Sequence, residues 1–139
     1  MRIFLYYIGK PRDANANALA AEYIKRAQRY GRCEMREIQP ARFELASKHP
    51  SATRILLDPA GKRIESVQFA DLVSKAEEAA RDMVFVIGGA SGYPDGWREQ
   101  ATMLLSLSTM TFPHEFARVM VAEQIYRAFT ILRGHPYSK

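Results

Sequence analysis

The stretch Met83–Gly92, MVFVIGGASG, decides the fold that we predict for this chain of 139 residues. Its first half, 83–87, is a run of apolar and β-branched residues, which is typical of a strand buried on both faces. Paired glycines follow, and glycine lets a backbone approach a ligand closely and allows positive φ. A buried strand that stops at glycines is how an α/β sheet opens a ligand crevice at its carboxyl edge. We therefore predict an α/β fold with a binding site at this turn.

The glycine turn matches neither of the two common phosphate-binding motifs. No Lys-Ser or Lys-Thr pair follows it, as a Walker loop requires, and the glycines do not have the spacing G-x-G-x-x-G. Backbone groups and apolar walls are therefore expected to hold the ligand. We expect a helix from Pro94 or Asp95 to about Leu105, and then a short segment, Leu107–Phe112, which Pro113 ends.

The remainder of the chain alternates strands and helices, which indicates a single α/β domain, residues 1–139, with a largely parallel sheet flanked by helices. The expected strands are 2–8, 33–38 and 54–58, and the expected helices are 17–30, 66–81 and 114–133, with a weak helix at 41–48. The strand at 33–38 alternates apolar and polar residues, so it is expected at an edge of the sheet.

Local signals set the expected ends of these elements. Asp13 or Asn15 is suited to cap the first helix and Gly31 to end it, and Ser66 is suited to cap the helix that follows it. The sequence DPAGK, 58–62, is typical of a tight turn. Region 39–53 is interpreted as a solvated and somewhat basic connector, to which we assign no chemistry.

Composition narrows the functional classes. The net charge is +5 and the sequence pI about 9.5, which favours an anionic partner, nucleic acid first, although a basic protein without such a partner fits composition as well. Cys33 is the only cysteine, so no internal disulfide can form, which suits a reducing compartment. Neither a membrane span nor a signal peptide is apparent, so we expect a cytoplasmic protein. The last helix carries apolar residues on more than one stripe, which suggests a subunit partner.

Four blocks of residues follow one another in the second half of the chain. They are FVIGGASG at 85–92, LSTMTFPH at 107–114, RV with EQIYRA between 118 and 128, and RGHPYSK at 133–139. In this order they closely resemble the ribosomal large-subunit RNA methyltransferase H family, whose members are small single-domain proteins of the SPOUT superfamily. The resemblance covers the whole chain, and four ordered blocks are far more specific than any one of them.

The resemblance implies a fold and an activity that residue patterns alone do not give. The fold would be a SPOUT-type α/β knot, a deep trefoil knot with the C-terminal helix threaded through a loop, although true knots are otherwise nearly absent from proteins. The protein would be a homodimer that uses S-adenosylmethionine and no metal. It would methylate N3 of a pseudouridine in the helix 69 loop of 23S rRNA, in the assembled ribosome rather than in naked RNA.

The resemblance also implies the cofactor contacts. They are Leu57, Gly88, Leu107, Ser108, Thr109, Met110, Thr111 and Phe112. This agrees with the need of an adenine ring for an apolar slot with a few backbone donors and acceptors. Leu57 on its own would be interpreted as an ordinary core leucine. Two departures from the family stand out: region 39–53 is shorter than usual, and Ser138 occupies a position that is often His.

Methylation at N3 requires the ring proton to leave, or the resulting anion to be stabilised. The catalytic candidates are Arg118, His135 and Tyr137. His114 and Arg133 are further candidates, although His114 could simply cap the last helix. Arg118 could instead form an ion pair between subunits, and Tyr137 could stack on a base. We favour positioning with anion stabilisation over a strong base.

Carboxylates and further cations have simpler interpretations. Glu115 and Glu123 are expected to be structural partners of Arg118 or Arg127. The expected phosphate contacts are Lys10, Arg12, Arg133 and Lys139. Two alternatives remain for function, a non-catalytic module that binds ribosomes or RNA and a SPOUT methyltransferase with another RNA target.

Overall fold

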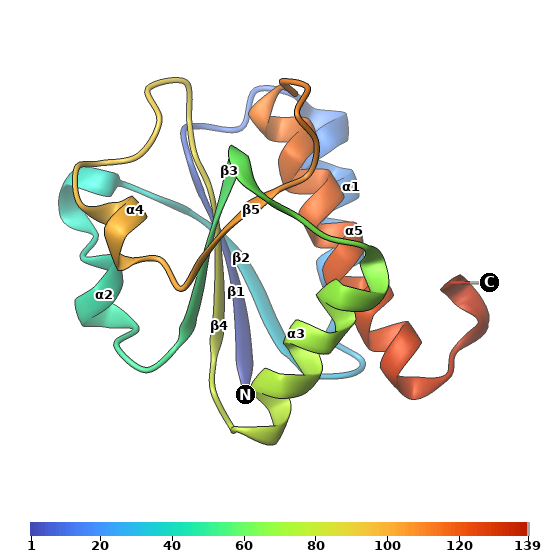
Figure 1. Cartoon of the computed structure of the whole chain (residues 1–139). Helices are drawn as coiled ribbons and strands as arrows, with labels where there is room; N and C mark the ends of the chain where they lie inside the picture. Colours follow the sequence, from blue (N-terminus) through green and yellow to red (C-terminus); the bar gives the residue numbers. More distant parts are fainter. Residues whose placement is uncertain (139) are drawn as a thin grey trace.

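The computed structural model describes residues 1–138 and contains one sheet of five parallel strands with helices on both faces (Figure 1). The strands are β1 (Arg2–Ile8), β2 (Arg32–Ile38), β3 (Thr53–Arg63), β4 (Met83–Ile87) and β5 (Met103–Ser106), in the order β2-β1-β4-β3-β5. The helices are α1 (Ala14–Ala27), α2 (Leu45–Lys48), α3 (Ser66–Glu78), α4 (Trp97–Gln100) and α5 (His114–Arg133), with 3-10 turns η1 (Pro40–Arg42) and η2 (Pro136–Ser138). The predicted parallel α/β fold is confirmed, and β2 is the edge strand that its alternating pattern indicated.

Two cores lie on the two faces of the sheet. Because neighbouring side chains of a strand point to opposite faces, β1 sends Ile3 and Leu5 into one core and Phe4 and Tyr6 into the other. The first core is covered by α1, α3 and α5, and the second by the short helices α2 and α4 (Figure 1). Strand β4, in the middle of the sheet, is fully buried, as its continuous apolar run predicted.

Helix α5 begins at His114 and ends at Arg133, as predicted. It lies against both α1 and α3 of its own chain, so two internal neighbours account for much of its broad apolar surface. Phe116 and Met120 are left over, with exposed fractions of 53% and 51%. These two residues are four apart and therefore stand on the same side of the helix.

Strand β3 is longer than predicted, and the tight turn expected at 58–62 is wrong. The strand continues to Arg63 through an irregularity between Leu57 and Lys62, where its register with β5 shifts. Gly61 makes this possible, because a Cβ atom there would lie 2.6 Å from the carbonyl carbon and oxygen of Leu104. The close approach of two strands is a tertiary feature that turn chemistry does not reveal.

The helix predicted from Pro94 or Asp95 to Leu105 is also wrong. Only Trp97–Gln100 is helical, and Leu105 belongs to strand β5. The segment 107–113 that follows is irregular rather than a regular element. Strand β5 completes the sheet beside β3, so the short apolar run 103–106 satisfies its backbone across strands rather than within a helix.

The ends of the other helices differ from the prediction in ways that capping explains. Helix α1 starts at Ala14 because the Asp13 carboxylate accepts a hydrogen bond from the Ala16 amide at 3.0 Å. It ends at Ala27, three residues before the predicted end at Tyr30, so the assignment of Gly31 as its C-terminal cap is wrong. Helix α3 is capped by Glu65, which forms a capping box with Gln68, and not by Ser66.

The prediction of a solvated connector at 39–53 is wrong. Phe43, Leu45 and His49 of this region are buried, and they pack on the second core beside Phe4 and Tyr6. The aromatic residues of one face of β1 would be left uncovered without this segment. The sequence did not indicate this burial, because the segment contains prolines and charged residues and only two large apolar side chains, Phe43 and Leu45.

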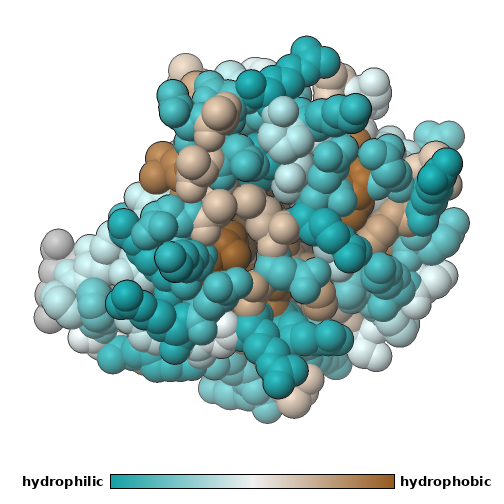
Figure 2. All heavy atoms as spheres, turned by 180° about the vertical axis from the view of Figure 1, so that it is seen from behind, coloured by the Kyte–Doolittle hydropathy of each residue, from teal (hydrophilic) through white to brown (hydrophobic). Residues whose placement is uncertain are grey.

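Cys33 lies in β2, is buried, and forms no disulfide. Burial raises the pKa of its thiol to about 12. No helix of residues 1–138 is long and apolar enough to cross a bilayer. The face turned away from the viewer of Figure 1 is largely hydrophilic, and its hydrophobic atoms appear in small groups (Figure 2).

Candidate functional site

A pocket of about 490 Å³ lies at the carboxyl ends of β4 and β5 and beside the irregularity in the middle of β3, where the glycine turn predicted it. Seven of the eight residues expected to contact a cofactor line this pocket, and Thr109 alone does not; the seven are Leu57, Gly88, Leu107, Ser108, Met110, Thr111 and Phe112. Residues 55 positions apart in sequence therefore meet at one edge of the sheet.

The paired glycines are needed for close packing rather than for backbone conformation. A Cβ atom on Gly88 would lie 3.2 Å from the ring of Tyr93, and one on Gly89 would lie 3.1 Å from the carbonyl oxygen of Ile8. Positive φ occurs only at the third glycine of the turn, Gly92, where φ is 75°. Of the two properties of glycine, close approach is used at the paired glycines and positive φ at Gly92.

Tyr93 fixes the geometry of the pocket, and sequence reasoning missed it. Its hydroxyl lies 2.9 Å from the carbonyl oxygen of Val86 and also within hydrogen-bond distance of that of Leu57. It thereby connects the carboxyl end of β4 with the irregularity in the middle of β3. Burial raises the pKa of this phenol above its ordinary value, so the hydroxyl remains a donor at neutral pH. The only sequence signal for Tyr93 was its position, four residues after Gly89 and close to the glycine turn.

The segment 107–113 forms the outer wall. Ser108 organises it, since its carbonyl oxygen accepts a bond from the Ser106 hydroxyl at 2.9 Å and its own hydroxyl accepts one from the Met110 amide at 3.0 Å. Met110 and Phe112 are exposed, at 69% and 39%. The wall is therefore apolar and open, a surface that a flat aromatic ligand or a partner could cover.

The polar side of the pocket contains an ion pair that was not predicted, because Asp58 was assigned to a tight turn. Asp58 and Arg98 both line the pocket, and their carboxylate and guanidinium lie 2.9 Å apart. The Asp58 side chain is only 10% exposed. His114, at the start of α5, also lines the pocket and supplies an exposed imidazole.

Arg118 does not line this pocket. Its side chain is 1% exposed, with the guanidinium carbon 3.9 Å from the centre of the Tyr7 ring and one nitrogen 3.5 Å from Glu115. Among residues 1–138, no group forms a hydrogen bond with any of its three guanidinium nitrogens. Glu115 in turn accepts bonds from the amides of Arg12 and Asp13, and these donors lower its pKa. The expected pairing of Glu115 with Arg118 is confirmed.

The other two catalytic candidates, His135 and Tyr137, lie beyond the far end of α5. Tyr137 donates a hydrogen bond to Glu123 at 2.7 Å and packs against the ring of Tyr126. Burial and this bond raise the pKa of Tyr137 above its usual value. Since Glu123 is in the middle of α5, the tail folds back along the second half of this helix, whereas the pocket lies at the start of the helix, beside His114.

The cations expected to contact phosphate are partly engaged within the chain. Arg133 pairs with Glu77 at 2.7 Å, and Glu123 pairs with Arg127 at 2.8 Å, as expected for Glu123. Lys10 and Arg12 are exposed. Lys139 lies outside the described residues.

Comparison with known proteins supplies independent information. The chain matches the family model described as predicted SPOUT methyltransferase over residues 1–138. It is 58% identical over 137 residues to the ribosomal RNA large subunit methyltransferase H of Solibacter usitatus, with 99% of each chain covered. It is 40% identical over 150 residues to the protein of that name from Gloeobacter violaceus, with 99% of this chain and 98% of the other covered.

Two solved structures have a similar fold. A probable methylase family protein from Haemophilus influenzae has a TM-score of 0.64 at 11% identity, covering 99% of this chain and 70% of that one. A putative methyltransferase from Legionella pneumophila, solved with bound S-adenosylmethionine, has a TM-score of 0.52 at 12% identity, covering 95% and 66%. At these identities the likeness concerns the fold alone.

Proposed function

Because the chain belongs to the ribosomal RNA large subunit methyltransferase H family, we propose that it methylates N3 of pseudouridine 1915 in 23S rRNA with S-adenosylmethionine as donor. The observation that carries this proposal is the 58% identity to a family member over 99% of both chains. The pocket at the carboxyl edge of the sheet is the proposed site of the donor.

The residues of this pocket fit S-adenosylmethionine. A volume of about 490 Å³ lies in the range of sites for ligands of this size. Leu57, Leu107 and Met110 offer apolar walls for an adenine ring, and Gly88 brings backbone close. When bound, S-adenosylmethionine would supply a methyl group that is bonded to a positively charged sulfur, and this sulfur is a good leaving group. Thr109, which does not line the pocket, is proposed as a contact of the same segment made on closure.

The chain must place the uracil-type ring and accommodate its N3 proton. Displacement at the methyl carbon requires the nitrogen at about 3 Å and in line with the sulfur, so fixed walls are the first requirement. His114 is the one proposed proton acceptor that lines the pocket. Arg118, His135 and Tyr137 remain our candidates for anion stabilisation and base positioning.

A second copy of the chain would unite these groups. The tail of one chain lies beside the second half of its own α5 and not in its own pocket, whereas antiparallel α5 helices would bring it to the pocket of the other. Phe116 and Met120, exposed on one side of α5, offer the apolar surface for such a contact. A deep trefoil knot is part of the same proposal, supported by the match to the SPOUT methyltransferase family.

The dimer can be tested in solution. Light scattering on the wild-type chain should give twice the chain mass, and the double variant Phe116→Glu with Met120→Glu should give the monomer mass. The monomeric variant should lose methylation while its circular dichroism stays unchanged. A wild-type monomer that methylates RNA would overturn the two-copy site.

The activity is tested by mass mapping of 23S rRNA from a strain that lacks the gene. We expect one methyl group to be absent and to return with the wild-type gene. Gly88→Arg should fail to restore it, because the added side chain fills the pocket. Val67→Arg is the matched control, since Val67 is 58% exposed on α3 and outside the pocket.

The alternative functions give different maps. An rRNA that is unchanged in the deletion strain would favour a binding module without turnover, and a methyl lost at another position would favour another RNA target. Calorimetry should show donor binding by the wild-type chain and the Val67→Arg control but not by Gly88→Arg. Methylation of assembled large subunits, compared with that of purified rRNA, tests the proposed preference for ribosomes and the cytoplasmic setting that it requires.

A further inference from the structure

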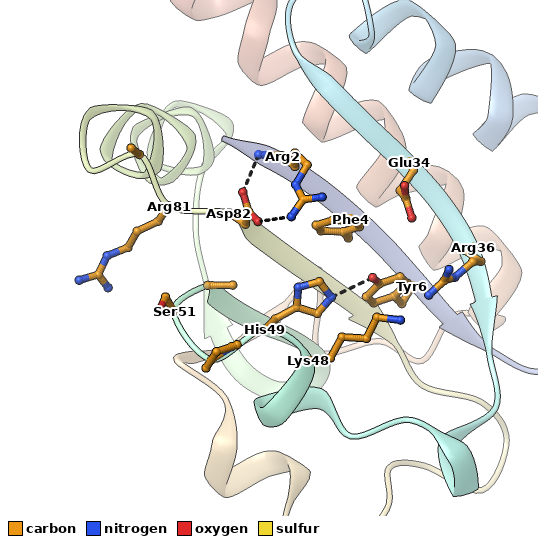
Figure 3. Close-up of a pocket in the computed structure, with 13 residues that line it drawn as sticks. Arg2, Phe4, Tyr6, Glu34, Arg36, Lys48, His49, Ser51, Arg81 and Asp82 are labelled. Atoms are coloured by element: carbon orange, nitrogen blue, oxygen red, sulfur yellow. Dashed lines mark hydrogen bonds and ion pairs between the residues drawn. The ribbon is translucent and has the colours of Figure 1, made fainter.

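A second pocket, of about 480 Å³, opens at the opposite edge of the sheet (Figure 3). It lies at the amino-terminal ends of β1, β3 and β4 and is closed on one side by α2 and the residues after it. Its lining runs along β1 and β2 as far as Tyr6 and Arg36, which are level with Val86 of β4, and it shares no residue with the lining of the donor pocket.

The lining has an excess of positive charge. Four cations, Arg2, Arg36, Lys48 and Arg81, face two carboxylates, Glu34 and Asp82. Asp82 is already engaged, because its two oxygens accept bonds from the amide and the guanidinium of Arg2 at 2.9 and 3.2 Å.

Three of the four cations have no such partner. Within residues 1–138 no carboxylate lies within 4.0 Å of the charged nitrogens of Arg36, Lys48 or Arg81. Figure 3 shows Arg81 directed away from the other lining side chains, so it adds to the positive electrostatic potential of the pocket but would not contact a bound anion.

Aromatic rings hold two of the cations in place. The Arg36 guanidinium lies 5.4 Å from the centre of the Tyr6 ring, and the Lys48 ammonium lies 5.2 Å from that of Phe43. Tyr6 and Phe43 themselves pack edge to face, 5.0 Å apart. Cations restrained in this way lose less freedom on binding an anion than cations on a free surface.

A buried donor faces the same space. His49 is 7% exposed and stands between Arg2 and Asp82 on one side and Tyr6 and Lys48 on the other (Figure 3). Its Nε2 lies 2.9 Å from the Tyr6 hydroxyl. Burial, followed by the charge of Lys48, lowers the pKa of His49, so the ring is neutral at pH 7.

The proton of this neutral ring is on Nδ1. The Tyr6 hydroxyl is buried and has no other acceptor among residues 1–138, so it must donate to Nε2. Nδ1 then carries the hydrogen, and among the same residues no group accepts it. Nδ1 of His49 is not among the fully buried atoms that lack a partner within residues 1–138, so its hydrogen faces the open space of the pocket, where an anion can accept it.

We propose that this pocket binds a backbone phosphate of the ribosomal RNA, as a second anchor at the edge of the sheet opposite the methyl donor. The inference rests on the proposed function, which supplies RNA as partner. Arg36 and Lys48 neutralise the phosphate, and His49 donates to one of its oxygens. The two pockets share no lining residue, so an RNA chain that reaches the donor pocket can place a second part of its backbone in this one.

The test uses the full chain and large ribosomal subunits from the deletion strain, with binding measured by co-sedimentation at several salt concentrations. The double variant Arg36→Gln with Lys48→Gln should bind at least tenfold more weakly. Its log–log salt slope should fall in magnitude by about 0.7, for the one phosphate that the pocket neutralises on single-stranded RNA. The control is Lys25→Gln with Arg29→Gln, which removes the same charge from exposed positions outside the pocket.

Donor binding by calorimetry separates this inference from the proposed activity. The pocket variant should bind S-adenosylmethionine as the wild type does, so a loss of methylation would come from RNA binding alone. Equal weakening by both double variants would overturn the inference, because charge alone would then explain it. Calorimetry with inorganic phosphate and with uridine monophosphate forms the last arm. Submillimolar binding of either one, with subunit binding unaffected by Arg36→Gln and Lys48→Gln, would assign the pocket to a small metabolite instead.

Discussion

Replacing Tyr93 by phenylalanine removes the one oxygen atom that joins two strands at the mouth of the donor pocket. The ring remains against Gly88 and stacked on Trp97, with 6.4 Å between ring centres, so the pocket keeps its shape. What is lost is the donor that faces the carbonyl oxygens of Leu57 and Val86. The substitution therefore isolates a hydrogen bond from packing.

The expected loss of stability follows from the number of hydrogen bonds that the Tyr93 hydroxyl can donate. A hydroxyl donates one hydrogen at a time, and the net contribution of one such bond is about 0.5 to 1.5 kcal/mol. A carbonyl left without a donor adds part of its desolvation cost, so we expect Tyr93→Phe to lower the free energy of unfolding by about 1 to 2 kcal/mol. With a urea dependence of about 1.5 kcal/mol per molar, the midpoint should fall by roughly 1 M.

Urea titration followed by circular dichroism measures this change, and Tyr30→Phe is its control. Tyr30 stacks on Phe129, and its hydroxyl forms no hydrogen bond with residues 1–138, so its loss should leave the midpoint nearly unchanged. Because the raised pKa keeps the Tyr93 hydroxyl protonated, the difference should be equal at pH 6 and pH 9. Equal midpoints for Tyr93→Phe and the wild type would refute the role assigned to this hydroxyl.

Further predictions concern three other places. Gly61→Ala should lower the free energy of unfolding by about 1 to 3 kcal/mol, because the new Cβ would lie 2.6 Å from the backbone of Leu104; a stable variant in urea titration would contradict the strand contact. His49 has a lowered pKa through burial and Lys48, so the unfolded chain takes up the proton first, and stability should decline as pH falls below about 6.5. His49→Asn should flatten that decline, and a slope that persists would assign it to other groups. Tyr137→Phe removes the 2.7 Å bond to Glu123, so carboxypeptidase should trim the tail faster than in the wild type.

The parts of the fold that depend on local patterns were predictable from sequence. Strand β4 follows from an apolar run bounded by glycine, and α5 from an apolar helix between Pro113 and Gly134, which takes φ of 69° as its C-terminal cap. The continuation of β3 to Arg63 and strand β5 were not, because the contact of Gly61 with β5 is made between segments distant in sequence. A turn signal and a strand signal overlap there, and only tertiary packing decides between them.

The candidate site divides in the same way. Its apolar lining followed from the family resemblance, whereas the tie from Tyr93 and the Asp58–Arg98 pair required the spatial arrangement. Region 39–53 shows the converse error. Its charged residues suggested solvent, yet His49 is among the most buried polar side chains of residues 1–138.

The condition of Cys33 has a practical consequence for experiments on the two-copy arrangement. Its thiol is buried in the edge strand β2, and at a pKa of about 12 almost none of it is thiolate at neutral pH. Maleimide reagents should therefore not react with it. A cysteine introduced at an exposed position such as Val67 would then be the sole reactive thiol of the chain. Spin or fluorescent probes attached there could report the separation between protomers without first deleting the native cysteine.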